Sequence, residues 1–165
     1  PVFSKYISQN FDSENITIIS PDVGGLVRAR DVAKRINAEL AIVDKRRPKA
    51  GVSEVMNIIG DVQGKNCVIV DDIVDSGGTL CNAASALLEK GAASVSACIT
   101  HGVLSGEACK KVENSDLSSL VVTNSIMPSE EARAVKNINI IDISDLLGQA
   151  IRNIDEEKSL SVLFN

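Results

Sequence analysis

Short apolar runs alternate along the chain with segments in which apolar residues recur at helical spacing. The runs have strand length and are rich in β-branched residues, and they occupy residues 16–20, 39–44, 67–70, 95–100, 120–123 and 138–142. Helical spacing follows several of them, for example from Leu26 to Ile36 and from Leu80 to Leu88. Unbroken apolar strands that alternate with helices are typical of an α/β fold, so we expect a mostly parallel sheet flanked by helices on both faces.

Weaker patterns predict further helices and one loop. Residues 1–10 suit a first helix, residues 105–108 suit the start of a short one, and residues 128–131 suit a capped helical turn with acidic residues near its positive end. Residues 49–57 lack a strong period, which predicts a mobile loop. A final helix is predicted by an apolar stripe made of Leu146, Leu147, Ala150, Ile151 and Ile154.

Composition narrows the class of protein. A length of 165 residues with 44% hydrophobic content suits one well-buried domain. No apolar segment approaches the roughly 18 to 20 residues that span a bilayer, so we expect a soluble, cytoplasmic protein with no membrane partner. Its four cysteines show no CxxC spacing and are expected to be reduced thiols. A net charge of −5 and 2% aromatic residues argue against a nucleic-acid surface.

The richest candidate chemistry follows the apolar run at residues 67–70. Asp71 and Asp72 come at its carboxyl end, and a glycine-rich turn then precedes a helix. Carboxylates accept hydrogen bonds from sugar hydroxyls or bind a metal that a substrate carries, whereas backbone N–H groups at a helix start bind phosphate. The stretch therefore predicts a phosphosugar site, although Asp and Gly are also ordinary turn residues. The predicted phosphate loop comprises Asp75, Ser76, Gly77, Gly78 and Thr79.

A second strand-to-helix turn follows residues 16–20. Gly24 and Gly25 lie just before the predicted helix at Leu26, where backbone donors suit a pyrophosphate, and Asp22 could hold a bridging magnesium ion. A simple structural turn explains this segment equally well. Arg28 and Arg30, one turn further on, read as a solvated helix face and are left outside the predicted site.

A basic cluster ends the run at residues 39–44. Lys45, Arg46 and Arg47 precede Pro48 and the predicted loop. Basic residues on a flexible arm can close over a phosphoryl group and neutralise its developing charge. A run of this kind is more commonly a solvated basic patch, so the residues alone leave both interpretations open.

Three stretches carry a family resemblance. CVIVDDIVDSGGTL resembles the ribose-5-phosphate loop of the type I phosphoribosyltransferases, with Ser76 and Gly77 as mild variants. SPDVGGLVRAR, and DKRRP followed by VSEVMNIIGDVQGK, resemble the corresponding segments of ribose-phosphate pyrophosphokinases, also called PRPP synthetases. THGVLSG and VKNINIIDIS follow the same family, so the resemblance covers nearly the whole chain.

The resemblance implies an activity and a set of residue roles. The family transfers pyrophosphate from ATP to the C1 hydroxyl of ribose 5-phosphate, giving PRPP and AMP, with Mg²⁺ as cofactor. By this resemblance Lys45 is the catalytic lysine and Arg47 contacts ribose 5-phosphate, while Asp22 binds magnesium. The implied pyrophosphate loop comprises Asp22, Val23, Gly24 and Gly25, and the implied ribose 5-phosphate site comprises Arg47, Asp71, Asp72 and the loop from Asp75 to Thr79.

The resemblance also bears on assembly and completeness. It implies an allosteric phosphate or ADP site at subunit contacts, built from Ser159, Ser161 and Phe164, and a homo-oligomer in which dimers form hexamers. The chain begins without methionine and matches a carboxy-terminal half, so we expect a fragment that has little activity without the ATP-binding half.

Two other functions of the chain, and the role of one residue, remain open. A complete phosphoribosyltransferase that uses PRPP and a base, and a non-catalytic regulatory synthetase subunit, are alternatives to the synthetase. A lone His101 after residues 95–100 could serve as an acid, a base or a ligand, but phosphoryl transfer to a sugar hydroxyl needs little acid–base help.

Overall fold

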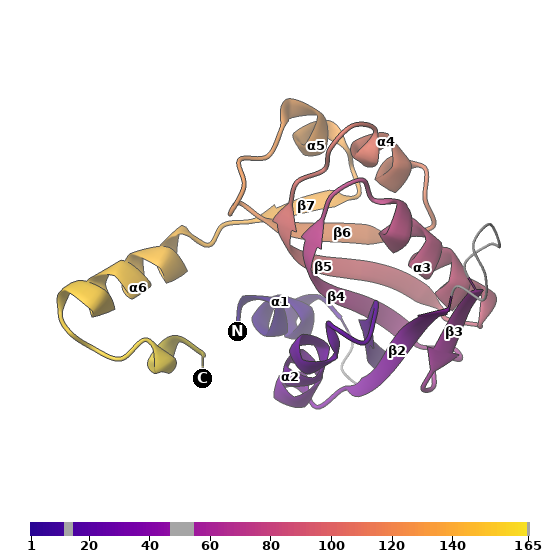
Figure 1. Ribbon diagram of the computed structural model, residues 1–165, viewed down its shortest axis with the longest axis horizontal. Coiled ribbons are helices and arrows are strands. Elements are labelled where there is room, and N and C mark those ends of the chain that lie inside the picture. Colours follow the sequence, from indigo (N-terminus) through magenta and orange to yellow (C-terminus); the bar gives the residue numbers. More distant parts are fainter. Residues whose placement is uncertain (12–14, 47–54, 165) are drawn as a thin grey trace.

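A computed structural model describes residues 1–11, 15–46 and 55–164, and within them one twisted sheet forms the centre of the molecule (Figure 1). Its seven strands lie in the order β3-β2-β1-β4-β5-β6-β7, and every neighbouring pair is parallel except β2 and β3. The predicted fold class is therefore confirmed. The strands are β1 (Ile16–Ser20), β2 (Glu39–Arg46), β3 (Val55–Ile59), β4 (Asn66–Val74), β5 (Ser94–Gly102), β6 (Ser119–Thr123) and β7 (Ile138–Ile141).

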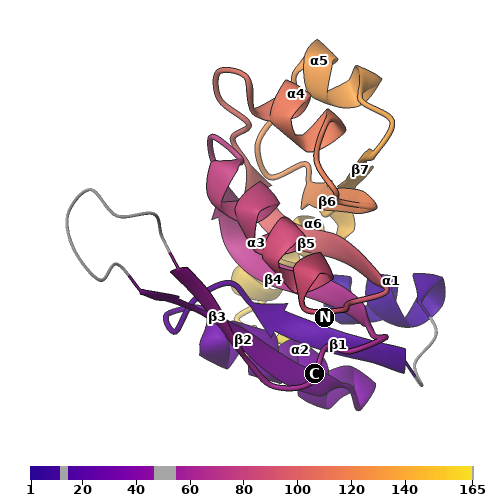
Figure 2. The ribbon, with the colours of Figure 1, turned by 90° about the vertical axis from the view of Figure 1, so that its right-hand side faces the viewer.

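Helices cover the sheet on both faces, as the alternating pattern predicts (Figures 1 and 2). One core cluster joins α3, α4 and α5 to the sheet, and it includes Leu87 and Val112. The other joins α1 and α2 to the opposite face through residues such as Ile7 and Ala33. The helices are α1 (Val2–Asn10), α2 (Leu26–Ile36), α3 (Gly78–Glu89), α4 (Ala108–Glu113), α5 (Glu130–Ala134) and α6 (Ser144–Asp155), with a final 3₁₀ turn η2 (Ser161–Phe164).

The strand order reverses beside β1, which fixes where a ligand can bind. After β1 the chain crosses through α2 to β2 on one side, and after β4 it crosses through α3 to β5 on the other. The turns that follow β1 and β4 therefore separate at the carboxyl edge of the sheet, and open α/β sheets bind ligands at such a point. Both predicted turns lie here, because β1 ends at Ser20 and β4 ends at Val74.

The structure corrects several predicted boundaries on the β2–β4 side. Residues 55–57, predicted as loop, belong to β3, and the rest of that loop at 49–54 lies outside the described residues. Lys45 and Arg46 belong to β2, where their backbones pair with Met56 and Val55. Strand β4 continues through Asp71 and Asp72 to Val74, because the parallel ladder with β5 runs on to Gly102.

Smaller corrections apply to the later elements. Helix α3 begins at Gly78 and not at Thr79, and α4 begins at Ala108, so Ser105 lies before the helix. Strand β7 ends at Ile141. The capped turn at residues 128–131 is confirmed, since the Ser129 hydroxyl accepts a hydrogen bond from the Ala132 N–H at the start of α5.

Helix α6 confirms the predicted final helix. Figure 1 shows it extending away from the sheet, and none of its residues is buried. In the described part of the chain, no helix is long and apolar enough to cross a membrane.

Candidate functional site

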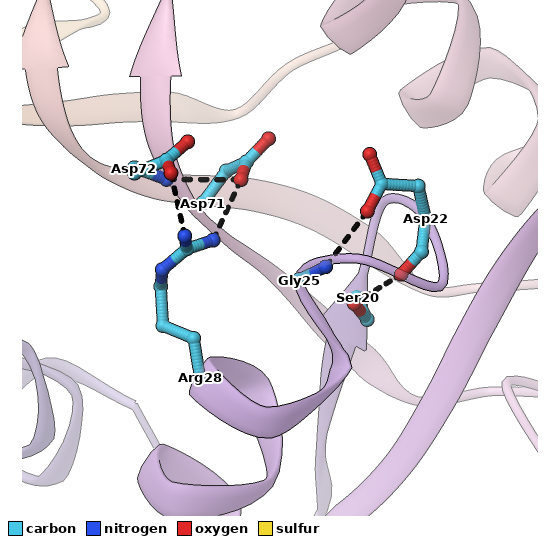
Figure 3. Close-up of polar contacts among 6 residues, drawn as sticks. All are labelled: Ser20, Asp22, Gly25, Arg28, Asp71 and Asp72. Carbon is cyan, nitrogen blue, oxygen red and sulfur yellow. Dashed lines mark hydrogen bonds and ion pairs between the residues drawn. The ribbon is translucent and has the colours of Figure 1, made fainter.

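The turn after β1 is held by its own side chains (Figure 3). The Asp22 carboxylate accepts a hydrogen bond from the Gly25 N–H at 2.8 Å, and the Ser20 hydroxyl donates to the Asp22 carbonyl at 2.7 Å. A Cβ atom at Gly25 would lie 3.2 Å from the Ser20 hydroxyl, so the turn leaves little room for a larger residue. Since the Gly25 N–H is already bound to Asp22, the turn offers a pyrophosphate fewer backbone donors than the sequence predicts.

Arg28 reaches from the first turn of α2 to both acidic residues of β4 (Figure 3). Its Nη1 lies 2.8 Å from Asp71 Oδ1 and its Nη2 lies 2.6 Å from Asp72 Oδ2. The Asp72 N–H also donates to Asp71 Oδ1 at 2.9 Å. The expectation of a solvated arginine face is therefore wrong for Arg28, whereas Arg30 is exposed. The sequence did contain a signal for this contact. Arg28 comes one helical turn after Gly25, which places it at the same edge of the sheet as Asp71.

Several effects of opposite sign act on the pKa of Asp71. Desolvation by burial raises the pKa of its carboxyl above the ordinary value, and the neighbouring charges of Asp72 and Asp22 raise it further. The Asp72 N–H and the Arg28 guanidinium lower it, but they do not cancel the rise. Asp22, Asp71 and Asp72 thus form one acidic cluster around Arg28, and Arg28 offsets part of their mutual repulsion.

The start of α3 has the backbone geometry of an anion-binding turn. Gly77 adopts a left-handed conformation with φ of 74°, immediately before the helix. A left-handed residue followed by helical residues turns successive N–H groups toward one concavity, and the helix dipole adds positive potential there. The N-cap residue Gly77 has no side chain to cap this helix start, in contrast to Ser129 at α5. The structure therefore places a left-handed glycine and a helix start in this turn, and phosphate binding by its N–H groups stays a prediction.

The acidic and glycine-rich parts of this stretch share one cavity of about 240 Å³. Pro21 contributes to its wall, which brings the turn after β1 to the same place. The predicted site residues that line it are Asp71, Asp75, Ser76, Gly77 and Thr79. Asp72 does not line the cavity but shares the Arg28 guanidinium with Asp71. The other predicted residues of the two turns that do not line it are Asp22, Val23, Gly24, Gly25 and Gly78.

The loop after β5 holds the predicted phosphate loop in place through backbone hydrogen bonds. Both Val103 and Leu104 donate backbone hydrogen bonds to the Val74 carbonyl, at 3.0 and 3.2 Å, and Ser105 donates to the Asp75 carbonyl at 3.1 Å. Leu104 takes a left-handed φ of 50° in this arrangement. The Lys111 ammonium lies 3.2 Å from the Ser76 carbonyl. These supporting residues were not predicted, because their contacts depend on the pairing of β4 with β5.

The remaining predicted residues fall elsewhere or outside the described part of the chain. Lys45 is the second-to-last residue of β2, near the carboxyl edge of the sheet, but only its backbone is described, and Arg47 lies outside the described residues. The Ser159 and Ser161 hydroxyls are 2.7 Å apart, and the Phe164 carbonyl accepts a hydrogen bond from Arg35, so this predicted allosteric set lies on the tail beside α2. His101 is exposed, and its Nδ1 lies 2.9 Å from the Ser125 hydroxyl.

The carboxylates of the site do not form a metal cage. Across residues 1–11, 15–46 and 55–164, no group of three or more His, Cys, Asp or Glu side chains is arranged to hold a metal ion. Mg²⁺, however, is commonly held by one or two carboxylates together with substrate phosphates. Exposed Asp22, with one oxygen bound to Gly25, fits that kind of shared site.

Comparisons with known proteins agree with this geometry. The family described as Phosphoribosyl synthetase-associated domain matches residues 43–165. Ribose-phosphate pyrophosphokinases from Hyphomonas neptunium and Brucella melitensis are 59% and 57% identical over the whole chain. The chain spans about half the length of these curated relatives, 53% in both cases.

Solved structures show the same relationship. Phosphoribosylpyrophosphate synthetase from Mycobacterium smegmatis superposes with a TM-score of 0.85 at 30% identity, over 94% of this chain and 50% of that one. A purine phosphoribosyltransferase from Pyrococcus horikoshii, with a TM-score of 0.54 at 19% identity over 86% of this chain and 82% of that one, shares the fold alone. The chain therefore belongs to the phosphoribosyl synthetase family, whose relatives compared above are ribose-phosphate pyrophosphokinases.

Proposed function

We propose that this chain is the ribose 5-phosphate-binding half of a ribose-phosphate diphosphokinase. In this reaction the C1 hydroxyl of ribose 5-phosphate attacks the β-phosphorus of ATP, the bond to the α-phosphate oxygen breaks, and PRPP and AMP are formed. The observation that carries the proposal is the single cavity in which Asp71 faces the Gly77 turn at the switch point of the sheet. Such a cavity suits a ligand with hydroxyls at one end and a phosphate at the other.

Each part of the cavity would take one part of the sugar phosphate. Asp71 and Asp72 would accept hydrogen bonds from the ribose hydroxyls, with Arg28 holding both carboxylates in place. The N–H groups at the start of α3 would bind the 5-phosphate, and the Ser76 and Thr79 hydroxyls would add donors. The C1 hydroxyl would then be fixed in position, and positioning supplies most of what phosphoryl transfer requires.

The attacked phosphate would lie toward the turn after β1 and the end of β2. Asp22, Val23, Gly24 and Gly25 would form the pyrophosphate loop, and Asp22 would hold Mg²⁺ shared with the substrate phosphates. Bound there, Mg²⁺ would neutralise phosphate charge. Lys45 and Arg47, in the roles that the family resemblance gives them, would stabilise charge on the transferring group.

The chain alone is expected to bind the sugar phosphate but to release little AMP. It spans about half of its relatives, and by the family resemblance the adenine-binding residues belong to the other half. Assembly into a homo-oligomer, regulation by phosphate or ADP at Ser159, Ser161 and Phe164, and a cytoplasmic location remain predictions.

Calorimetric titration with ribose 5-phosphate tests the proposal directly. Asp71→Asn and Thr79→Val should each weaken binding by about tenfold or more, because each removes hydrogen bonds to one end of the ligand. Glu89→Gln is the matched control, since it removes a carboxylate at the far end of α3 and should leave the affinity unchanged. Binding that is indifferent to both site variants would contradict the proposal.

A further inference from the structure

Three successive carbonyl groups of the predicted phosphate loop are bound by the segment that follows β5. The Val74 and Asp75 carbonyls accept hydrogen bonds from backbone N–H groups of residues 103–105, at distances of 3.0 to 3.2 Å. The Ser76 carbonyl accepts its bond from a side chain, the Lys111 ammonium of α4, at 3.2 Å. The third bond of this series therefore depends on which residue occupies one position in α4.

These bonds determine the direction of the N–H groups in the loop. A peptide unit is planar and trans, so the carbonyl of one residue and the N–H of the next residue point in opposite directions. None of the described residues 103–111 lines the cavity of the candidate site, whereas Asp75, Ser76 and Gly77 do. Carbonyls held on the side of α4 therefore leave the N–H groups of these three residues directed toward the cavity.

The Gly77 N–H is the donor whose direction depends on Lys111. It belongs to the same peptide unit as the Ser76 carbonyl, and Gly77 is buried in its left-handed conformation. Within the part of the chain that the structure describes, this N–H has no hydrogen-bond acceptor. Buried N–H groups are nearly always paired, so an unpaired one at the wall of a cavity suits an anionic ligand.

Helix α4 holds Lys111 directly behind the start of α3. The Lys111 carbonyl lies 3.8 Å from the Cys81 sulfur, which belongs to the first turn of α3. On the loop side of that turn, a Cβ atom at Gly77 would lie 3.7 Å from the Ala108 carbonyl of α4. Lys111 thus spans the turn, with its backbone beside Cys81 and its ammonium at Ser76.

The preceding lysine of α4 makes a different contact. The Lys110 ammonium lies 3.3 Å from the Glu107 carboxylate, and 65% of the Lys110 side chain is exposed. The two lysines carry the same charge at adjacent positions, and of the two it is Lys111 that contacts the phosphate loop. Lys110 is therefore a matched control for the charge of Lys111.

We propose that Lys111 is a positioning residue for ribose 5-phosphate, because it holds the Ser76–Gly77 peptide with the Gly77 N–H facing the 5-phosphate. This role rests on the proposed function, which assigns the cavity to the sugar phosphate. Lys111 does not line the cavity and acts through the loop. A loop that is already held in its binding conformation loses less conformational freedom when the ligand binds, so the affinity increases.

Calorimetric titration of the full chain with ribose 5-phosphate tests this role. Lys111→Met keeps an unbranched side chain but removes the donor, and it should weaken binding by about fivefold or more. Lys111→Arg restores a charged donor and should recover most of the affinity. Lys110→Met removes the same charge from the adjacent position and should bind like the unmodified chain. Equal losses in the two methionine variants would overturn the proposal, because long-range charge would then explain both.

NMR spectroscopy separates positioning from loss of the fold. In the unmodified chain the Gly77 amide proton should move downfield when ribose 5-phosphate is added, because it gains a phosphate acceptor. This movement should be much smaller in Lys111→Met, whereas the melting temperature should change little, since Lys111 is exposed. A Gly77 shift that persists in this variant would overturn the proposal.

Failure of this proposal differs from failure of the proposed function. Unchanged binding in Lys111→Met together with weakened binding in Asp71→Asn would overturn the role of Lys111 alone. If the unmodified chain does not bind ribose 5-phosphate, both proposals are wrong.

Discussion

Arg28 shows how one side chain can organise a site that is otherwise acidic. Its ion pairs with Asp71 and Asp72 are partly exposed, with 36% of the Arg28 side chain accessible, so each adds only about 1 kcal/mol or less to stability. Their importance lies in charge balance and orientation. Without the guanidinium, three neighbouring carboxylates would repel one another at the place where sugar hydroxyls are expected to bind.

Replacing Arg28 by glutamine should raise the pKa of Asp71. The guanidinium lowers that pKa, so its removal leaves burial and the charges of Asp72 and Asp22 opposed only by the hydrogen bond from the Asp72 N–H. Carbon-detected NMR titration of the carboxyl groups measures the shift. Arg30→Gln, an exposed arginine on the same helix, is the control and should leave the Asp71 titration unchanged. An unchanged pKa in the Arg28 variant would show that the pair is not populated in solution.

The raised pKa of Asp71 also fixes the sign of its pH dependence. Between the ordinary pKa of 3.8 and the raised native value, the native state binds more protons than the unfolded state. The contribution of this group to stability is therefore largest below 3.8 and declines as the pH rises through the native pKa. This decline is the expected cost of keeping the Asp71 carboxylate in a partly buried position.

At the scale of elements, the start of α3 depends on two adjacent glycines with different roles. Gly77 has a left-handed φ, whereas a Cβ at Gly78 would meet open space. We expect Gly77→Ala to lower the free energy of unfolding by about 1–2 kcal/mol and to weaken binding of ribose 5-phosphate. Gly78→Ala should preserve the loop and raise stability by up to about 1 kcal/mol, because alanine favours helix. Urea unfolding and calorimetry test both, and similar losses in the two variants would contradict the assigned turn.

The start of α6 depends on Asp142. Its carboxylate accepts hydrogen bonds from the Ser144 hydroxyl at 2.5 Å, the Ser144 N–H at 2.8 Å and the Asn124 amide at 2.8 Å, and these bonds lower the pKa of Asp142. Because the native pKa is lowered, this contribution is present above 3.8 and is lost as the pH falls through the native value. We expect Asp142→Ala to unwind the first turn of α6, seen as a loss of helical ¹³C shifts at Ser144. Asp155→Ala, at the other end of α6, should leave that turn intact.

The sequence predicts an element well when neighbouring residues determine it, and poorly when contacts with distant residues do. Residues 67–70 are apolar without interruption and residues 16–20 are mostly β-branched, so β1 and β4 could be placed from the sequence. The end of β4 could not, because Asp71 and Asp72 interrupt the apolar run and only the partner strand β5 keeps them in the ladder. Strand β3 was missed for a similar reason, since its antiparallel pairing with β2 is a tertiary contact.

The candidate site shows the same difference between features set by local sequence and features set by tertiary contacts. The order of strand, acidic pair, glycine turn and helix predicted a cavity that contains Asp71 and Thr79. Arg28 was assigned to a solvated face, because its partners lie 43 and 44 residues away in sequence and become neighbours only when β4 pairs with β1. A local pattern cannot distinguish such an arginine from Arg30.

At the scale of the whole molecule, the two core clusters share one sheet and should unfold together. Cys67 belongs to the cluster under α3–α5 and Cys98 to the cluster under α1 and α2, and both are buried. Burial raises the pKa of Cys67 to about 11 and that of Cys98 to about 12, which leaves little thiolate to react at pH 8. Each thiol thus reports when its own face of the sheet opens.

Thiol labelling at pH 8 tests whether the domain is one cooperative unit. Half-buried Cys81 should react first, whereas Cys67 and Cys98 should react slowly and at equal rates, because β4 and β5 contribute side chains to both clusters and neither face can open without disturbing the shared strands. Mass spectrometry of labelled peptides follows each site, and Cys81→Ser should remove the fast phase without changing the slow one. Faster labelling of Cys98 than of Cys67 would instead show that α1 and α2 detach independently, and the face that they cover would then be the less stable half of the domain.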